Sequence, residues 1–549
     1  MMEDKNGHLT FPSMFDETLR KFGKSNAYSF VGEIPISYEE VHREIQSVIA
    51  FLEKNGIVQG DKVAILSSNM PNWGIAFFAV TFMGAVAVPI LPDFSSTEVN
   101  NVITHSGARA IFVSTSLLPK SEEIVSEDLI LRILIDDFSL LPDASGLSPR
   151  TSGSIPLKKY EVAESDLASI IYTSGTTGRS KGVMLTHKNI TFTALKARNI
   201  QYLDETDRFL SVLPLSHTYE NTLGLILSMV CGSCVFYLKK PPTPAVLLPA
   251  LEEIRPTIML TVPLIIEKIY FNKILPAFRD KMILRLLCKI PFMRKILHGA
   301  AGKKLYKTFG GELKFFGIGG AKLNKTVEKF LIEAKFPYAI GYGLTETSPL
   351  LAGANPKKSV FESTGPAMEG VELSINNPDK ITGEGEIWAK GPNVMQGYYK
   401  EPELTKEVLT ADGWFKTGDL GTFDKNKNLY IKGRLKNMII GASGENIYPE
   451  EIESVINNFR FVVESLVIEQ KGKLVALVHI NMDELEKKYQ HLKKDMTKQF
   501  EEKVDEILYE LHEYVNSQVS KFSQIQKVVL QPVPFQKTAT QKIKRFLYT

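Results

Sequence analysis

Short apolar runs alternate with longer segments of helical periodicity along this chain. Val63–Leu66, Val86–Ile90 and Ala110–Val113 have the length and composition of buried strands. Tyr38–Lys54 instead repeats apolar residues at helical spacing. Such alternation is typical of mostly parallel sheets covered by helices, so the pattern predicts an α/β fold.

The stretch from Trp73 to Pro92 contains no charged residue over twenty positions, which is long enough to cross a bilayer. Gly74, Gly84 and Pro89 interrupt it, however, and strand-like segments flank it. We therefore predict a buried helix followed by a buried strand.

The C-terminal part has a different pattern. Leu466–Glu469 and Lys473–Ile480 resemble strands, and the charged segment around Glu484–Val519 resembles a helix that is polar on nearly all sides. This combination predicts a small α+β domain of about 110 residues that carries an exposed helix.

Residues 268–307 are strongly basic and interleaved with large apolar residues. The basic residues are Lys268, Lys273, Arg279, Lys281, Arg285, Lys289, Arg294, Lys295, Lys303, Lys304 and Lys307, and Asp280 is the one acid among them. A segment of this kind can lie in a membrane interface. It can equally be a solvated helix with an apolar face toward the core, and the sequence leaves both interpretations open.

Composition restricts the class of protein. A chain of 549 residues is too long for a single core, and its 44% hydrophobic and 23% charged residues are ordinary for a globular protein. A net charge of +3 does not indicate nucleic-acid binding. Three cysteines and an N-terminus without a signal-peptide pattern predict a reducing, cytoplasmic location. Cys231 and Cys234 are predicted to pack in the core rather than to bind zinc.

Residues 172–182 carry the clearest chemical signal, a loop rich in glycine, hydroxyl and basic side chains. Its candidate phosphate-binding residues are Thr173, Ser174, Gly175, Thr176, Thr177, Gly178 and Lys181. It is not a Walker A loop, because Ser180, Lys181 and Gly182 replace the required Gly-Lys-Ser/Thr. The flanks, Leu167–Tyr172 and Val183–Thr186, resemble strands.

This loop resembles the phosphate loop of the adenylate-forming (AMP-binding) enzymes, which include acyl-CoA synthetases, luciferases and peptide-synthetase adenylation domains. The other motifs that resemble this family follow in its order: Gly319–Ala321, Gly341–Thr347, Lys416–Asp419, Gly433–Lys436 and Lys537–Ile543. The resemblance covers roughly residues 30 to 545. Six motifs in the same order make it specific.

The resemblance implies attack of a carboxylate on the α-phosphorus of ATP, with release of pyrophosphate. Two anions must meet, so positive charge and alignment should supply most of the rate. The implied catalytic residues are Lys542, Thr345, Glu346 and His217. Glu346 would also bind Mg²⁺, which commonly takes one or two carboxylates and completes its shell with phosphate and water.

The resemblance also implies where the nucleoside binds. Its candidate contacts are Gly319, Gly320, Ala321, Gly341, Tyr342, Gly343, Asp419 and Arg434. Tyr342 would offer a ring face to adenine, and Asp419 would accept hydrogen bonds from the ribose hydroxyls. The alternative for Asp419 is a plain turn residue, because Thr-Gly-Asp is common in turns.

His217 lies in Leu213–Glu220, which resembles the family segment that lines the acyl pocket. It would orient the carboxylate or gate the pocket; the alternative is a hydrogen-bonded core histidine. The apolar run Leu223–Val230 could form a wall of an acyl tunnel, or simply belong to the core.

The family pattern implies two domains, residues 1–435 with the ATP and acyl sites and a mobile domain 436–549 with Lys542. The hinge would be Lys436. After adenylation the small domain would rotate, withdrawing Lys542 and bringing Gly441 and Gly444 to a thiol channel. Gln536 and Gln541 stand where the family has proline and glycine, which leaves the presentation of Lys542 open.

The predicted function is activation of a long-chain fatty acid by ATP and transfer of the acyl group to CoA. An acyl carrier protein is the alternative acceptor. Amino-acid adenylation is disfavoured, while oxidative luciferase chemistry stays open. From other classes, a phosphate-loop ATPase or kinase and an inactive membrane-docked binding protein are the competing hypotheses.

Overall fold

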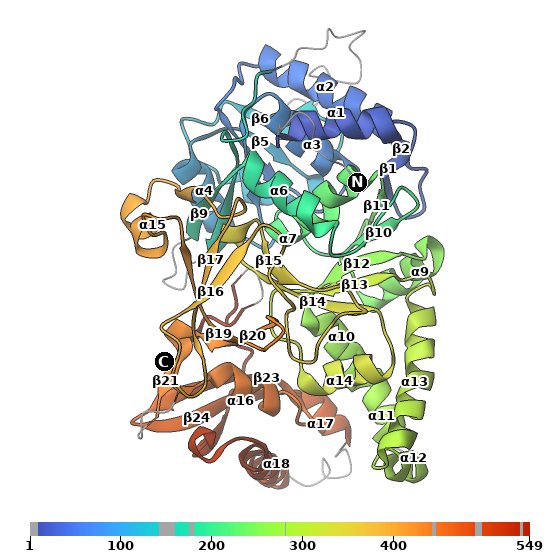
Figure 1. The fold of residues 1–549 in the computed structure, drawn as a ribbon, viewed down its shortest axis with the longest axis vertical. Coiled ribbons are helices and arrows are strands. Elements are labelled where there is room, and N and C mark those ends of the chain that lie inside the picture. Colours follow the sequence, from blue (N-terminus) through green and yellow to red (C-terminus); the bar gives the residue numbers. More distant parts are fainter. Residues whose placement is uncertain are drawn as a thin grey trace.

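Two large sheets form the frame of the molecule, and sheets of four, three and two strands follow them toward the C-terminus in the described residues (Figure 1). The computed structural model describes residues 9–141, 160–174, 180–279, 281–441, 446–488, 497–538 and 542–548. Both large sheets have eight strands, and their inner strands run parallel. The predicted α/β class is thereby confirmed.

The first eight-stranded sheet contains the two strands that flank the predicted phosphate loop. Its strand order is β18 (Gly397–Tyr398), β9 (Ser180–Thr186), β8 (Leu167–Ser174), β4 (Val86–Ile90), β3 (Lys62–Leu66), β5 (Ala108–Val113), β6 (Leu131–Leu134) and β7 (Ser139–Leu140). β8 and β9 pair antiparallel on the two sides of the predicted phosphate loop, so the flanking strands that the sequence predicted are confirmed.

The second eight-stranded sheet contains the strands that precede the adenylate motifs. Its order is β15 (Leu350–Gly353), β14 (Tyr338–Gly343), β13 (Phe315–Ile318), β12 (Ile258–Thr261), β10 (Arg208–Ser211), β11 (Cys234–Tyr237), β1 (Asn26–Phe30) and β2 (Ile36–Ser37). From β14 to β1 every neighbouring pair is parallel, so these strands end at one edge of the sheet.

Helices fill the space beside and between these sheets. They are α1 (Phe11–Phe22), α2 (Tyr38–Lys54), α3 (Pro71–Phe82), α4 (Ser96–Ser106), α5 (Leu118–Glu122), α6 (His187–Ala197), α7 (Thr218–Glu220), α8 (Leu227–Cys231), α9 (Pro244–Ile254), α14 (Lys325–Glu333) and α15 (Pro402–Val408). α2 has the predicted limits. Its first turn is fixed by a capping box, in which Ser37 and Glu40 exchange backbone and side-chain hydrogen bonds.

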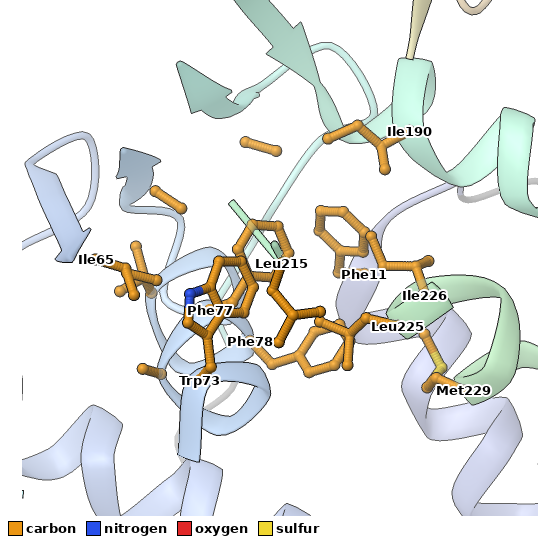
Figure 2. Packing of buried hydrophobic residues seen from close by; sticks show 14 of the residues in the cluster. Phe11, Ile65, Trp73, Phe77, Phe78, Ile190, Leu215, Leu225, Ile226 and Met229 are labelled. Atoms are coloured by element: carbon orange, nitrogen blue, oxygen red, sulfur yellow. The ribbon is translucent and has the colours of Figure 1, made fainter. Parts of the chain in front are cut away.

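α3 is the centre of the main core. Eleven of its twelve residues are buried; Phe77 and Phe78 pack edge-on against Phe11 of α1, and Trp73 stacks on Phe77 (Figure 2). β4 follows it directly, so the predicted buried helix and strand are confirmed. Among the residues described here, no helix is long and apolar enough to cross a membrane. Cys231 and Cys234 are both buried in the core, as expected.

A four-stranded antiparallel sheet links the large sheets to the C-terminal part. It consists of β16 (Glu372–Asn376), β17 (Gly385–Lys390), β19 (Phe415–Phe423) and β20 (Leu429–Arg434). β21 (Ile439–Ile440) and β22 (Asn446–Ile447) pair just after it.

The C-terminal part is α+β and has its own hydrophobic core. Its elements are α16 (Pro449–Ile456), β23 (Val462–Gln470), β24 (Lys473–Ile480), α17 (Met482–Lys488), α18 (Thr497–Gln518) and β25 (Lys527–Leu530). The expectation of a helix polar on nearly all sides is wrong. α18 buries Val504, Ile507, Leu511 and Val515, an apolar stripe at helical spacing that many surrounding charges obscured in the sequence.

The basic segment 268–307 is mostly helical. It contains the end of α10 (Pro263–Ile269), a π-helical turn Tyr270–Ile274, α11 (Leu275–Arg279), α12 (Met282–Leu287) and α13 (Pro291–Thr308). These helices form the lower right edge of the molecule in Figure 1.

Candidate active site

The candidate residues meet where parallel strands end. Gly319 directly follows β13, Gly341 lies in the last half of β14, and His217 lies in the connection after β10. Ligands of open α/β sheets bind outside the carboxyl ends of the strands. The topology therefore brings three motifs that are far apart in sequence to one edge.

Two glycines of these motifs, Gly343 and Gly319, lie tightly against neighbouring groups. A Cβ atom on Gly343 would lie 1.6 Å from the carbonyl oxygen of Pro349. A Cβ atom on Gly319 would lie 3.1 Å from the ring of Tyr219. Only glycine fits at Gly343, whereas a side chain at Gly319 would require the Tyr219 ring to shift by a few tenths of an ångström.

Asp419 is the centre of a buried charged group. Tyr342 donates a hydrogen bond to its Oδ2 over 2.8 Å, and the Nε of Arg434 lies 2.8 Å from its Oδ1. Asp419 and Arg434 are directly paired residues of β19 and β20. Burial raises the pKa of the Asp419 carboxyl, while Arg434 and Tyr342 oppose that rise. With 4% of its surface exposed and two partners, Asp419 is not a plain turn residue.

Glu346 lies in a 3₁₀ turn, Thr345–Thr347, immediately after β14. Its Oε1 accepts a hydrogen bond of 2.9 Å from the hydroxyl of Tyr398. The Nζ of Lys181 lies 5.1 Å from the centre of the same tyrosine ring. Tyr398 thereby joins the carboxylate to the base of the predicted phosphate loop.

The base of that loop is a regular hairpin. Thr173 pairs with Lys181, and Ser174 pairs with Ser180. The remaining predicted phosphate-binding residues, Gly175, Thr176, Thr177 and Gly178, lie outside the described residues.

Lys542 approaches this group from the C-terminal part. Water exclusion by the surrounding protein and the charge of Arg434 lower the pKa of Lys542, while Asp419 and Glu346 raise it. The side chain is nevertheless solvent-accessible. Lys542 thus responds to one cation and two carboxylates while part of it stays exposed, and we call the space among these four residues the crevice.

The other basic residues of the last motif are engaged elsewhere. The Nζ of Lys537 lies 2.5 Å from Glu464, and Arg545 lies 2.5 Å from Glu453. The backbone N–H of Thr538 donates to the carbonyl of Lys542, and the backbone N–H of Lys542 donates to the hydroxyl of Thr538. Gln541 lies outside the described residues.

His217 belongs to the same crevice. Its Nδ1 accepts a hydrogen bond of 3.2 Å from the backbone N–H of Tyr219 and so caps α7. Burial, and then the charge of Lys542, lower the pKa of His217 to about 4. The imidazole is therefore neutral near neutral pH, and its hydrogen resides on Nε2, where it can be donated.

An apolar cavity of about 60 Å³ adjoins the adenylate motif. Ile340 and Gly341 form part of its wall, with Tyr219, Leu223 and Leu227 beside them. Of the eighteen lining residues, only Gln201 and Tyr219 carry a polar side-chain atom. The apolar run Leu223–Val230 thus contributes to a cavity wall as well as to the core.

The remaining predicted residues lie at the margin of this group. Gly320 and Ala321 follow Gly319 and are exposed. Lys436 lies in the 3₁₀ turn Leu435–Asn437 that follows Arg434. Gly441 follows β21 and makes no recorded contact with the crevice among the described residues, and Gly444 lies outside them.

Sequence reasoning missed two tyrosines. Tyr398 reaches Glu346 because β18 pairs with β9, more than two hundred positions away in the chain. Tyr219 packs on Gly319 and lines the cavity. Tyr219 lies in the same segment as His217, Leu213–Glu220, and could have been singled out there; nothing in the sequence indicated Tyr398.

Comparison with known proteins identifies the family of this chain. A model of the AMP-binding enzyme family matches residues 15–399. Long chain acyl-CoA synthetase 6, peroxisomal, of Arabidopsis thaliana is 30% identical over 471 residues, which cover 79% of this chain and 67% of that protein. The chloroplastic long-chain-fatty-acid–[acyl-carrier-protein] ligase of the same plant is 28% identical over 543 residues, with coverage of 83% and 73%.

Among solved structures, O-succinylbenzoate coenzyme A synthetase from Bacillus subtilis, in complex with AMP, has a similar fold. The TM-score is 0.77, with 22% identity and coverage of 97% for both chains. At this identity the likeness concerns the fold.

Proposed function

Because this chain belongs to the AMP-binding enzyme family, we propose that it activates a long-chain fatty acid with ATP and transfers the acyl group to CoA. The observation that carries this proposal is a group of charged side chains from distant segments next to an apolar cavity. Asp419 is bound by Tyr342 and Arg434, it and Glu346 influence the charge of Lys542, and Gly341, the residue before Tyr342, lines the cavity. Adenylation of an acid needs both a charged site for ATP and an adjoining apolar one for its chain.

In the first half-reaction, a carboxylate oxygen attacks the α-phosphorus of ATP. The bond from that phosphorus to the bridging oxygen breaks, and pyrophosphate leaves. Lys542 would neutralise charge that develops between the carboxylate and the α-phosphate, and Thr345 would donate to the α-phosphate. The Nε2–H of neutral His217 would hold the carboxylate in line for attack.

Binding of the nucleotide would use both sides of the crevice. Asp419, held by Tyr342 and Arg434, would accept hydrogen bonds from the ribose hydroxyls. The hairpin base with Thr173 and Lys181 would approach the β and γ phosphates.

Glu346 fits a role as a magnesium ligand. Tyr398 donates to Oε1, and the second oxygen has no hydrogen-bond partner among the described residues. A single carboxylate with phosphate oxygens suits magnesium better than a cage made only of protein. When bound, the ion would supply charge neutralisation on the phosphates.

In the second half-reaction, the thiol sulfur attacks the acyl carbon, AMP leaves, and the thiol loses its proton. Residues 436–549 would move as a unit about Lys436, exchanging Lys542 for the segment with Gly441 and Gly444. The influence of Asp419 and Glu346 on the charge of Lys542 supports assigning this arrangement to the first half-reaction.

Long-chain acids are favoured by the apolar lining of the cavity and by similarity to the Arabidopsis long chain acyl-CoA synthetase. At 60 Å³ the cavity is too small for such a chain, so its walls would part on binding. Similarity to the carrier-protein ligase keeps acyl carrier protein as a second acceptor, which delivers the same thiol.

A pyrophosphate-release screen with acids of increasing chain length tests this function. We expect AMP and pyrophosphate as products, kcat/KM that rises toward long chains, and faster turnover with CoA than with carrier protein. Formation of ADP, or no dependence on the added acid, would refute acid adenylation. A preference for short or aromatic acids would refute only the long-chain assignment.

A further inference from the structure

The helices α12 and the first half of α13 present an unusual surface at one edge of the molecule (Figure 1). Six large apolar side chains in residues 282–296 are at least half exposed: Met282 68%, Ile283 72%, Leu286 50%, Ile290 52%, Phe292 70% and Ile296 50%. They are a quarter of the 24 exposed large apolar residues recorded for the described chain. We call this group the α12–α13 patch.

The charges around the patch have one sign. Lys281, Arg285, Lys289 and Lys295 are exposed between the apolar side chains. None of the four has an ion-pair partner within the described ranges, and the sequence contains no acid from residue 281 to residue 311. Arg294 is different, because it pairs with Glu333.

The helix α13, which carries part of the patch, is anchored to the large part of the molecule. His298 and Arg294 both bind Glu333 of α14, at 2.7 and 2.8 Å. Gly302 packs so closely on Ala334 that a Cβ atom would lie 2.5 Å from the alanine Cβ. These contacts fix α13 to the large part of the molecule, and none of them uses the exposed apolar side chains of the patch.

We propose that the α12–α13 patch docks this protein onto the surface of an anionic lipid bilayer. Apolar side chains would enter the interface, and the four free cations would meet lipid phosphates, with their aliphatic stems lying along the apolar groups. A second copy of this chain is a poorer occupant, because it would bring the same unpaired positive charges together. The docking is peripheral and does not depend on the proposed function.

The test uses the full chain and two kinds of vesicle, phosphatidylcholine alone and phosphatidylcholine with phosphatidylglycerol. We expect sedimentation with the anionic vesicles at low salt and release at high salt. Each removed charge should weaken binding roughly five-fold, so K281Q/R285Q/K289Q/K295Q should lose at least about a hundred-fold. I283S/F292S should also weaken binding to the anionic vesicles, even at low salt.

The matched control is K357Q/K358Q/K380Q/K425Q, which removes four exposed lysines elsewhere. It should bind like the wild type. All variants should release pyrophosphate normally with a short, water-soluble acid if the wild type does, since none of these residues lies in the crevice. The proposal is overturned if the wild type does not sediment with anionic vesicles. It is also overturned if the patch variants and the control variant bind these vesicles equally well. The proposal also fails if the patch side chains are required for self-association of the protein while the protein does not bind vesicles.

Discussion

Lys542 is the one cation of the last motif that faces the crevice. Lys537 and Arg545 each pair with a glutamate of the C-terminal part, so their charges are already compensated. Lys542 instead has Arg434 as a repelling neighbour and Asp419 and Glu346 as attracting ones. A lysine in this position is able to follow an anionic substrate, because its point charge sits on a flexible stem.

Replacing Lys542 by alanine should separate the two half-reactions. Acyl-adenylate formation should fall by at least on the order of 10²-fold, the usual loss when one preorganised donor at a developing charge is removed. Thioester formation from supplied acyl-adenylate should remain. Pyrophosphate release and thioester formation are measured separately.

Lys544→Ala is the control for that variant, because Lys544 has a similar place in the sequence but no recorded contact with the crevice residues. It should leave both rates near the wild-type values. Equal loss of both half-reactions in Lys542→Ala would contradict the assigned role.

The short helix α7 and the π-helical segment Asn221–Ile226 after it bury an acidic side chain. Glu220 is 2% exposed, and its Oε2 has no hydrogen-bond partner among the described residues. The wide turn of the π-helical segment places Gly224 against it, where a Cβ atom would lie 2.8 Å from Oε1. Burial raises the pKa of Glu220 to about 8, and a hydrogen bond with Ser211 opposes the rise.

Glu220 should make stability depend on pH. Between about pH 4.5 and pH 8 the unfolded chain releases a proton that the folded chain keeps, so stability falls as pH rises. The loss from this group approaches about 4–5 kcal/mol near pH 8. Glu220→Gln should remove most of this pH-dependent loss of stability. The Tm of the variant should therefore decline less than the Tm of the wild type between about pH 5 and pH 8.

Glu252→Gln serves as the reference, since Glu252 is exposed on α9. Its Tm should follow the wild type across the same range. Parallel Tm curves for wild type and Glu220→Gln would contradict a protonated Glu220 in the folded state.

Strand pairing decides how the charged side chains meet. Asp419 and Arg434 face each other because β19 and β20 are antiparallel with these residues in register. A shift of one residue would turn Arg434 to the other face of the sheet. In the same way, the pairing of β18 with β9 places Tyr398 between Lys181 and Glu346.

The orientation of the C-terminal part is held by a few polar contacts. Asn324 donates to Asn458 over 2.6 Å, and Tyr448 donates to Glu384 over 2.6 Å. Lys322 and Glu451 form a further ion pair at 3.3 Å. Polar contacts of this number contribute only a few kcal/mol, which suits an arrangement that has to change between two half-reactions.

Removing two of these contacts should shift the balance between orientations. Tyr448→Phe with Asn458→Ala should slow acyl-adenylate formation roughly 5- to 30-fold, since each hydrogen bond contributes about 1 kcal/mol. Thioester formation from supplied acyl-adenylate should be unchanged or faster. Single-turnover assays of each half-reaction measure both effects.

Ser517→Ala is a suitable comparison, because Ser517 bonds only within α18. It should change neither rate. If the double variant slowed both half-reactions equally, the contacts would be acting on stability rather than on orientation.

Much of the fold was predictable from local pattern. α2, β4 and β24 have the predicted limits because their apolar periodicity and end signals are local properties. α18 was misjudged, because its apolar stripe of four residues is diluted by charge and is visible only against the core it covers. The candidate crevice was predictable as a set of motifs, but not as a set of contacts.

The amino-acid sequence by itself determined the order of strands and helices, the α/β class and the identity of six chemically distinctive segments, because these depend on neighbours a few positions apart. The tertiary structure alone decided which cation of the last motif faces Asp419, which tyrosine joins Lys181 to Glu346, and which apolar residues of 282–296 remain uncovered. Those outcomes depend on strand pairing and packing between distant segments, where a side chain's partner is set by the geometry of the whole fold.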